Sequence, residues 1–315
     1  MISVIGQGFV GGSLSTVFSE RGVGVFTFDK AGKTERGGTS EFFVGSSNII
    51  PSTLSQFVEC CESINQFSGI YFICLPTPMK ADGSCDVSIV ESVLDQLSLN
   101  NQRGLSRVAI VKSTVPPGTT EGWNKKYSNT SLSVIFSPEF LTEANALDDM
   151  RNQDRIILGG HNDSTEKVSS VFLNAFPGVP LYKTTSTNAE MVKYVANCFL
   201  ATKVSFANEM YQACNSLTAL GNDVSYNSVI SLAKLDKRLG DSHWQVPGPM
   251  PADDDGKPAY GFSGSCFPKD INALIYLLEN LGVDPKVLKG AWGKNLEVRP
   301  QRDWEKLKGR AISSE

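Results

Sequence analysis

Cys266 is the residue of this chain best suited to covalent chemistry. It follows the glycine-rich run 261–264 and stands two residues before Pro268, which suits the first turn of a helix because its missing N–H would be unpaired there. Apolar residues at helical spacing then continue to Gly282. A thiol at a helix N-terminus loses its proton readily, because the dipole and the unpaired amides there favour an anion. With Asp270 in the first turn, the segment predicts a nucleophilic thiolate; a buried cysteine that packs as a small hydrophobe is the alternative.

A second pair of polar side chains belongs to the longest predicted helix. Residues 187–190, Thr-Asn-Ala-Glu, have the pattern of a capping box, and apolar spacing then runs without proline or glycine to about Leu217. These roughly 30 residues extend about 45 Å, which suits a spine between two domains or a dimer interface. Lys193 and Asn197 lie four residues apart on one face. We interpret them as hydrogen-bond donors to a developing oxyanion, the alternative being a surface lysine and an asparagine at the core edge.

The N-terminus has the pattern of a dinucleotide-binding turn. A buried strand at 2–5 leads into Gly-Gln-Gly-Phe-Val-Gly and a helical stretch, and a second strand at 23–28 ends at Asp29. The glycines allow a tight turn, close approach of a pyrophosphate and close packing of helix on strand. An acid at the ribose hydroxyls repels a 2′-phosphate and favours NAD over NADP, although Lys30 and Lys33 weaken that preference. The predicted cofactor-binding residues are Gly6, Gly8, Phe9, Val10, Gly11, Asp29 and, after two later strands, Thr77 and Thr114.

Strands and helices alternate through the rest of the first half. Buried strands are predicted at 70–75, 108–112, 132–136 and 155–158, with a helix at 87–97 between the first two. This alternation indicates a parallel sheet with helices on both faces, whose ligands bind beyond the carboxyl ends of the strands. The polar residues that follow three of these strands are Thr77, Thr114, Glu139 and Glu143. We expect them to converge on one crevice, with turn capping and a solvated helix start as alternatives.

Composition argues against several classes of function. The chain has 315 residues, 41% of them hydrophobic, and a net charge of -4, which indicates two globular domains and argues against broad nucleic-acid binding. We expect no membrane span, because no apolar run approaches about 18 residues, and no signal peptide. Seven cysteines without scaffold-like spacing indicate free thiols in a reducing, cytoplasmic compartment. With only His161 and His243 present, neither a histidine metal site nor a Ser-His-Asp triad is expected.

Together these motifs resemble the nucleotide-sugar dehydrogenase family, most closely the UDP-glucose 6-dehydrogenases. The match runs in order through GQGFVG, KSTVPPGTT, SPEFLTE, NAEMVKYVAN, DKRLG and GFSGSCFPKD and covers nearly the whole chain. The resemblance implies an NAD-dependent enzyme of polysaccharide-precursor synthesis that oxidises the sugar C6 alcohol twice, through an aldehyde captured by the cysteine and a thioester that water hydrolyses. A covalent anchor suits such a four-electron oxidation, because the aldehyde stays bound while the cofactor is exchanged.

The resemblance also implies roles for individual residues. Asp270 would transfer protons with a water held by Thr114, Cys266 would be the nucleophile, and no metal is implied. The implied catalytic residues are Cys266, Lys193, Asn197, Asp270, Thr114 and Glu143. The implied substrate-binding residues are Glu139, Phe140, Leu141, Glu143, Lys193, Asn197, Arg238 and Gly264. Because the family's arginine at the position of Arg238 reaches the substrate of a partner subunit, the resemblance implies a homodimer.

Three divisions of the chain are expected. They are an NAD-binding Rossmann-type α/β domain at 1–185, a helical catalytic and dimerisation domain containing the long helix at 186–295, and a short tail at 296–315. The family usually carries a third α/β domain that holds much of the nucleotide, and the tail is too short for one. UDP-glucose is the expected substrate, with GDP-mannose and a UDP-hexosamine as alternatives, and the basic tail is expected to be solvated.

Two other functions stay open on the sequence. A β-hydroxyacid dehydrogenase has a similar length, a dinucleotide domain and a Lys-x-x-x-Asn helix, but its single hydride transfer requires no cysteine. An NAD-binding sensor without turnover is the non-enzymatic alternative. The motif GFSGSCFPKD favours the double oxidation over both.

Overall fold

The computed structural model describes residues 1–30, 52–64, 66–99, 104–249 and 258–314, and Lys33 lies outside them. The chain forms two compact units. Unit 1 comprises residues 1–77 and 87–193, and unit 2 comprises residues 78–86 and 194–315. Helix α7, Ser186–Ala219, contributes its first turns to unit 1 and the remainder to unit 2.

Within the described residues, a sheet of seven strands forms the centre of unit 1. The strands are β1 (Ile2–Ile5), β2 (Val25–Phe28), β3 (Ile70–Ile73), β4 (Arg107–Val111), β5 (Leu132–Phe136), β6 (Ile156–Gly159) and β7 (Leu181–Thr184). They are hydrogen-bonded in the order β2-β1-β3-β4-β5-β6-β7. All neighbours run parallel except β5 and β6, which pair antiparallel through Phe136 and Gly159. The predicted α/β fold is confirmed, and the expectation of a wholly parallel sheet is wrong at this pair.

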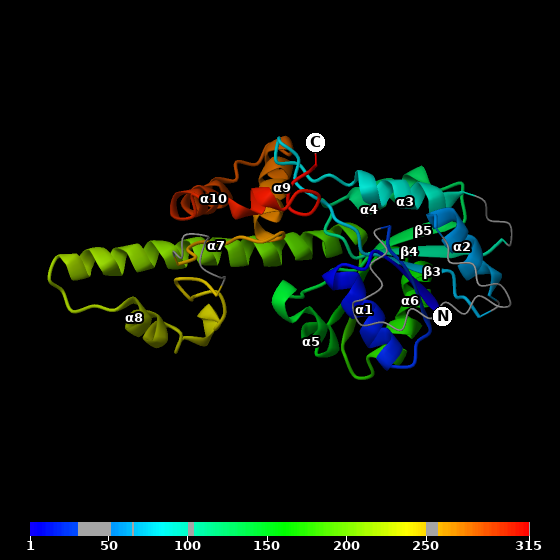
Figure 1. Ribbon diagram of the computed structural model, residues 1–315, viewed down its shortest axis with the longest axis horizontal. Coiled ribbons are helices and arrows are strands. Elements are labelled where there is room, and N and C mark those ends of the chain that lie inside the picture. Colours follow the sequence, from blue (N-terminus) through cyan, green and yellow to red (C-terminus); the bar gives the residue numbers. More distant parts are fainter. Residues whose placement is uncertain (31–51, 65, 100–103, 250–257, 315) are drawn as a thin grey trace. The chain divides into compact units, whose positions relative to one another are not determined.

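Helices cover both faces of the sheet, as Figure 1 shows. One layer contains α2 (Leu54–Ser63), α3 (Ser88–Ser98) and α4 (Thr119–Lys126), and the other contains α1 (Phe9–Glu20), α5 (Ala146–Arg151) and α6 (Asn162–Ala175). Every residue of β1, β3 and β4 is buried, as expected for strands with a helical layer on each side. The connection from β5 to β6 carries a 3-10 turn at Glu143–Asn145 and the six-residue α5.

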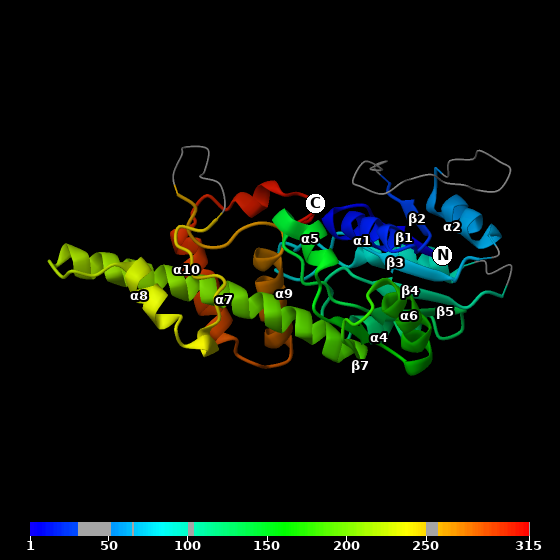
Figure 2. The ribbon, with the colours of Figure 1, turned by 90° about the horizontal axis from the view of Figure 1, so that it is seen from below.

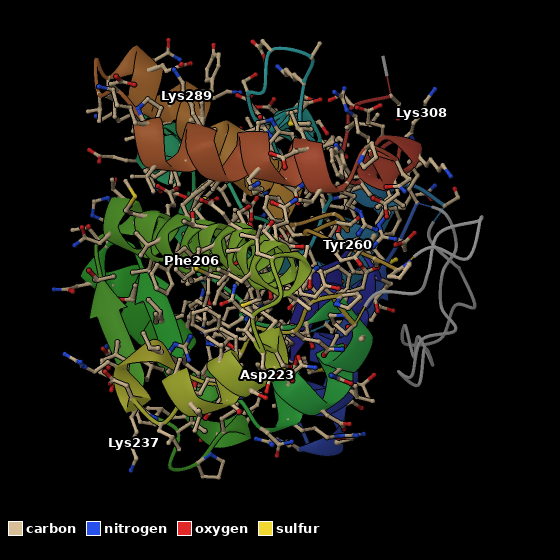
Figure 3. The ribbon with its side chains drawn as sticks, turned by 90° about the vertical axis from the view of Figure 1, so that its left-hand side faces the viewer. Phe206, Asp223, Lys237, Tyr260, Lys289 and Lys308 are labelled. Carbon is tan, nitrogen blue, oxygen red and sulfur yellow. The ribbon has the colours of Figure 1, made fainter. Side chains whose placement is uncertain are left out.

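Unit 2 is built from helices. Beyond its share of α7 it contains α8 (Tyr226–Ala233), α9 (Phe267–Asn280) and α10 (Lys286–Val298), with 3-10 turns at Lys237–Leu239 and Asp303–Lys306. Helices α9 and α10 lie on one side of α7 and α8 lies on the other (Figures 1 and 3). Figure 2 shows α9 and α10 crossing the direction of α7. The long helix therefore acts as the support on which the other helices of unit 2 pack.

The C-terminal tail folds against unit 2. The Met79 amide donates to the Ala311 carbonyl at 2.9 Å, and the Ser313 amide donates to the Met79 carbonyl at 2.8 Å. Trp304 is almost wholly buried, and its ring centroid lies 5.3 Å from that of Trp292. The expectation of a solvated tail is therefore wrong for these residues, although the basic side chains between them are exposed. Burial of the Trp304 indole and the two backbone hydrogen bonds with Met79 hold the tail in place, although the segment is basic.

Helix α7 begins with a different cap from the predicted one. The Thr185 hydroxyl accepts an amide hydrogen of the first turn at 3.2 Å, so Thr185 and not Thr187 caps the helix. Glu190, predicted to complete a capping box, instead accepts the amides of Gly118 and Thr120 at 2.6 and 2.8 Å. Those amides belong to the start of α4. A carboxylate near the start of α7 therefore caps a different helix.

None of the described helices is both long enough and apolar enough to cross a membrane.

Candidate functional site

The glycine-rich turn of unit 1 lies where the strand order reverses. β1 is flanked by β2 on one side and β3 on the other, and such a switch point is where α/β sheets bind ligands. Gly6 has φ +91°, and a Cβ there would lie 2.3 Å from the Cys74 carbonyl oxygen. A Cβ on Gly11 would lie 1.9 Å from the Gly6 carbonyl oxygen. Gly8 is exposed at the N-terminus of α1 with nothing within 4 Å of a Cβ, so its backbone is open to an incoming phosphate.

The groups around this turn fit a dinucleotide. The Gln7 amide donates to the Asp29 carboxylate at 2.8 Å, which fixes the acid at the end of β2 beside the turn. Phe9 and Val10 form the half-buried start of α1, whose first turn contains no acidic residue, so its amides and dipole favour a pyrophosphate. A carboxylate that accepts hydrogen bonds from the ribose hydroxyls disfavours a 2′-phosphate, and this suits NAD.

Two threonines tie together the carboxyl ends of β3 and β4. The Thr77 hydroxyl donates to the Thr114 carbonyl at 2.7 Å, and both residues are buried. One step earlier along the strands, the Leu75 amide donates to the Ser113 hydroxyl at 2.9 Å. The structure therefore brings together the two threonines that the sequence selected from separate motifs.

A buried cluster of two lysines and one carboxylate lies beyond β4 and β5. Lys193 Nζ donates to the Glu139 carbonyl at 2.6 Å and to the Glu139 carboxylate at 2.9 Å. Lys112 Nζ donates to the Ser137 hydroxyl at 3.2 Å and to the Pro138 carbonyl at 3.1 Å. The three charged side chains are each less than a tenth exposed. The sequence reasoning missed Lys112, although a lysine that ends an otherwise apolar strand was the signal.

The charges of this cluster set one another's protonation. Burial would raise the pKa of the Glu139 carboxyl, but the Lys193 ammonium, the Leu141 amide and the Lys112 ammonium together lower that pKa. Burial lowers the pKa of Lys112 to about 8, against the opposing attraction of Glu139. Glu139 is therefore held as a carboxylate, whereas Lys112 gives up its proton slightly above neutral pH.

The two residues that follow Glu139 adjoin the ion pair of Glu139 and Lys193. The Leu141 amide donates to the Glu139 carboxylate at 2.7 Å. The Lys193 Nζ atom lies 5.7 Å from the centroid of the Phe140 ring, which is within the range of a cation–π contact. Glu139, Phe140 and Leu141, which the resemblance assigned to the substrate, are thus gathered at Lys193.

In unit 2, Cys266 occupies the N-cap position of α9, as predicted. Its carbonyl accepts the Asp270 amide at 2.9 Å, and its sulfur lies 3.8 Å from the Ser265 hydroxyl oxygen. Gly264, with φ +77°, turns the chain two residues earlier, and Pro268 occupies the first turn of the helix. The sulfur therefore lies where the unpaired amides of a helix favour an anion.

Asp270 is the centre of a buried polar group in the same unit. Asn197 Nδ2 donates to one oxygen of its carboxylate at 2.6 Å, and Lys269 Nζ donates to the other. The Cys198 sulfur lies 3.6 Å from the Asp270 carbonyl oxygen. Asn197 and Asp270, which the sequence selected separately, are therefore hydrogen-bonded to each other.

Lys269 is a candidate that the sequence reasoning missed. Burial would lower the pKa of its ammonium, but the charges of Asp270, Cys85 and Cys266 raise that pKa above its ordinary value. Lys269 is thus a fixed cation within electrostatic reach of the Cys266 sulfur, and a nearby cation stabilises a thiolate. The signal in the sequence was a lysine in the first turn of a helix, where it opposes the helix dipole.

Two of the predicted substrate-binding residues are exposed. Glu143 is exposed in the 3-10 turn that precedes α5. Arg238 is exposed in the turn Lys237–Leu239, where its guanidinium donates to the Asp236 carboxylate at 2.9 Å. Within the part of the chain that the structure describes, His, Cys, Asp and Glu form no group of three that could hold a metal ion.

Known proteins match along most of the chain. Residues 1–176 match the NAD-binding domain of the UDP-glucose/GDP-mannose dehydrogenase family, and residues 187–296 match the central domain of that family. The UDP-glucose 6-dehydrogenase YwqF of Bacillus subtilis is 31% identical over 301 residues, which are 91% of this chain and 64% of YwqF. The structure of a UDP-glucose dehydrogenase from Pyrobaculum islandicum has 30% identity and a TM-score of 0.71, over 94% of this chain and 68% of that one.

A likeness of fold extends further. The 3-hydroxyisobutyrate dehydrogenase of Mycobacterium tuberculosis has a TM-score of 0.63 over 96% of this chain and 94% of its own, at 18% identity. At that identity the likeness concerns the fold alone. This chain spans 64% of the length of YwqF and about half of some other curated relatives that it matches.

Proposed function

Because the chain belongs to the UDP-glucose/GDP-mannose dehydrogenase family, we propose that it oxidises the primary alcohol of a nucleotide sugar to a carboxylate in two steps. The observation that carries this proposal is Cys266 at the N-terminus of α9, within electrostatic reach of the Lys269 ammonium. A single hydride transfer needs no nucleophile. Two oxidations at one carbon need a group that holds the aldehyde between them, and a thiolate suits that role.

In the first step the sugar C6 alcohol loses a hydride, and its hydroxyl proton passes to Asp270. The Cys266 sulfur then bonds to the aldehyde carbon, and the resulting thiohemiacetal loses a second hydride and becomes a thioester. Water then hydrolyses the thioester, which releases the carboxylate and restores the thiol. Asp270, with a bound water held by Thr114, is proposed to serve proton transfer. When bound, NAD⁺ supplies the hydride acceptor, one molecule for each oxidation.

Lys193 and Asn197 are proposed to stabilise the oxyanions of these steps. Each is fixed by a carboxylate, Lys193 by Glu139 and Asn197 by Asp270. An ammonium has three N–H groups and a primary amide has two, so each side chain has a donor beyond these bonds. Donors whose direction is set before the reaction stabilise developing charge without reorganising.

The substrate that we propose is UDP-glucose, with GDP-mannose and a UDP-hexosamine as alternatives. Support comes from the similarity to YwqF and to the Pyrobaculum islandicum structure, both named for UDP-glucose. The residues that we propose to contact the substrate are Glu139, Phe140, Leu141, Glu143, Lys193, Asn197, Arg238 and Gly264.

The decisive measurement counts NADH for each acid molecule formed. The purified protein is incubated with UDP-glucose, GDP-mannose or a UDP-N-acetylhexosamine, with NAD⁺ in one series and NADP⁺ in the other. We expect two NADH for each UDP-glucose consumed, UDP-glucuronate as the product, and faster reduction of NAD⁺ than of NADP⁺. One NADH for each substrate consumed, with no acid formed, would refute the double oxidation.

A second candidate is the single oxidation of a β-hydroxyacid. Lys193 and Asn197 keep it open, because such enzymes share the Lys-x-x-x-Asn spacing on a helix. In that case Cys266 has no chemical role, so Cys266→Ala would reduce NAD⁺ as fast as the wild type with a 3-hydroxyacid. Reduction of NAD⁺ by nucleotide sugars and not by 3-hydroxyacids would exclude this alternative.

We further propose that the protein is a homodimer that buries apolar side chains of α7 and α8. Val195 and Phe199, four residues apart on α7, are 58% and 66% exposed. Leu232 of α8 is 67% exposed, and Leu235, which follows α8, is 76% exposed. Grouped apolar side chains of this kind mark interaction surfaces. Light scattering after gel filtration should give twice the chain mass of 34.1 kDa. Phe199→Glu should give the monomer mass, and a monomeric wild type would contradict the proposal.

A further inference from the structure

The segment that leads to Cys266 is held by side chains instead of regular structure. Residues 260–262 belong to no helix or strand. The Phe262 amide donates to the Asn295 side-chain oxygen at 2.7 Å, and Asn295 Nδ2 donates to the Phe262 carbonyl at 3.1 Å. Asn295 comes from α10 and is 0% exposed. One side chain thus makes the two hydrogen bonds that a neighbouring strand would otherwise supply.

The adjoining backbone groups have partners of their own. The Gly261 amide donates to the Asn208 side-chain oxygen from α7 at 3.3 Å. Arg299 donates to the carbonyl of Tyr260, which is labelled in Figure 3, at 2.8 Å. Arg299 is itself fixed by two hydrogen bonds to Asp303, at 2.8 and 2.6 Å. Three consecutive residues are therefore held by α7, by α10 and by the tail that follows α10.

Gly261 allows Asn295 to approach so closely. Its φ is +67°, and a Cβ there would lie 2.4 Å from the Asn295 side-chain oxygen. The Phe262 ring, buried, packs against the ring of Phe267 with centroids 6.0 Å apart. Phe267 is the first residue of α9 and follows Cys266 directly. The hydrogen bonds to Phe262 therefore act on the chain both before and after Cys266.

We propose that Asn295 and Arg299 are positioning residues for Cys266. They hold residues 260–262 so that the sulfur stays at the N-terminus of α9. They act through the backbone and do not touch the substrate. This inference rests on the proposed function for the role of Cys266, but the reactivity of the thiol tests it without any substrate.

The first readout is the rate at which iodoacetamide alkylates Cys266 in the full-length protein, followed by peptide mass spectrometry across neutral and alkaline pH. Asn295→Asp removes the N–H donor and places a carboxylate against the Phe262 carbonyl. The sulfur should then move away from the N-terminus of α9, so the pKa of the Cys266 thiol should rise. Alkylation of Cys266 at neutral pH should slow by about fivefold or more. Cys60, a partly exposed thiol in α2 of unit 1, serves as an internal reference. The second readout is kcat for acid formation, expected to fall about tenfold or more while the Kd for NAD⁺ stays within about twofold.

Asn124 provides a matched control. Its side-chain oxygen accepts the Val134 amide at 2.9 Å and its Nδ2 donates to the Val134 carbonyl at 2.8 Å, the same pair of bonds within unit 1. Asn124→Asp should therefore leave the alkylation profile of Cys266 unchanged. Arg299→Lys is the second test variant: it keeps a donor for the Tyr260 carbonyl but loses the two-bond pairing with Asp303. Its effect should have the same direction and be smaller, about twofold.

Equal alkylation profiles in the wild type, Asn295→Asp and Arg299→Lys would overturn the proposal, whatever the activity. Loss of folding in both variants, seen as loss of NAD⁺ binding and of a cooperative melt, would also overturn it, because the residues would then be structural. If the profile shifts as expected but the wild type forms no acid from any nucleotide sugar, the positioning role stands and the proposed double oxidation fails.

Discussion

The two units build their parts of the chemistry in different ways. In unit 1 the glycine turn forms because its glycines have no Cβ to clash with the neighbouring backbone. The strand and the helix that flank the turn are consecutive in the sequence. In unit 2 the segment before Cys266 takes its hydrogen bonds from Asn208 and Asn295, which are 53 and 33 residues away from their partners. A short stretch of sequence suffices for the first arrangement, whereas the second exists only when α7 and α10 have packed.

This difference predicts that a substitution in one unit impairs the function of that unit alone. A change in the glycine turn should weaken dinucleotide binding and leave the thiol chemistry intact. A change in the cysteine segment should do the reverse. Paired measurements of NAD⁺ affinity and of Cys266 alkylation therefore test the comparison directly.

The largest effect is expected from Cys266→Ala. Without the sulfur nothing holds the aldehyde, so acid formation should fall by about a thousandfold or more, while the Kd for NAD⁺ changes by less than about twofold. Product chromatography and calorimetric titration give the two values. Cys214→Ala, which removes a buried thiol elsewhere in unit 2, is the control. Acid production by Cys266→Ala at the wild-type rate would exclude the cysteine as nucleophile.

Gly6→Ala should show the opposite pattern. The new Cβ would lie 2.3 Å from the Cys74 carbonyl oxygen at φ +91°, so we expect a loss of about 3 kcal/mol in the free energy of unfolding and about tenfold weaker NAD⁺ binding. Cys266 alkylation should not change. Gly22→Ala is the control, because Gly22 has φ +78° and nothing lies within 4 Å of a Cβ there. Gly22→Ala therefore measures the effect of the positive φ alone, a loss of about 1 kcal/mol in the free energy of unfolding. Equal NAD⁺ affinity in Gly6→Ala and the wild type would contradict the role of the turn.

The same contrast explains what the sequence alone predicted. Strands β1, β3, β4 and β5 were placed to within two residues, because an apolar run followed by a glycine or polar turn is a local pattern. Cys266 at the start of α9 was predicted for the same reason, since Pro268 and the apolar spacing lie beside it. Strand β7 and the reversal of β6 were missed, because both depend on pairing with neighbours that are distant in sequence.

Residues whose partners are distant in the sequence leave no local sequence pattern that predicts their role. Asn295 stands in an amphipathic helix, where an asparagine has the appearance of a surface residue until α10 packs against the cysteine segment. Glu190 misled the prediction, because a capping box has the same sequence whether the carboxylate turns back on its own helix or reaches another. Lys112 belongs with them: a lysine at a strand end is ordinary unless Glu139 and Lys193 surround it.

Lys112 provides a pH test of the buried cluster of unit 1. Its pKa is about 8 in the folded protein, because burial disfavours the ammonium, against about 10.4 in an unfolded chain. Between these values the unfolded chain binds more protons, so the free energy of unfolding of the wild type should rise with pH, by up to about 3 kcal/mol. Lys112→Met should lose that rise in urea unfolding, while Lys125→Met, at an exposed position, should keep it. The same slope in Lys112→Met and the wild type would show that the ammonium is not disfavoured by burial.

Glu190→Gln should have the smallest effect and tests the comparison most closely, because Glu190 is a long-range contact within unit 1. It accepts the Gly118 amide from 72 residues away, and its pKa is raised by burial, so the charged form is already disfavoured. An amide oxygen can keep one of the two bonds to the start of α4, and the expected loss in the free energy of unfolding is about 1 kcal/mol. Glu121→Gln, exposed in the first turn of α4, should lose less than about half of that. NAD⁺ affinity should be unchanged in both variants, because the glycine turn is complete in its own stretch of sequence. A tenfold loss of affinity in Glu190→Gln alone would show that unit 1 also depends on a distant clamp, and the distinction between the two units would fail.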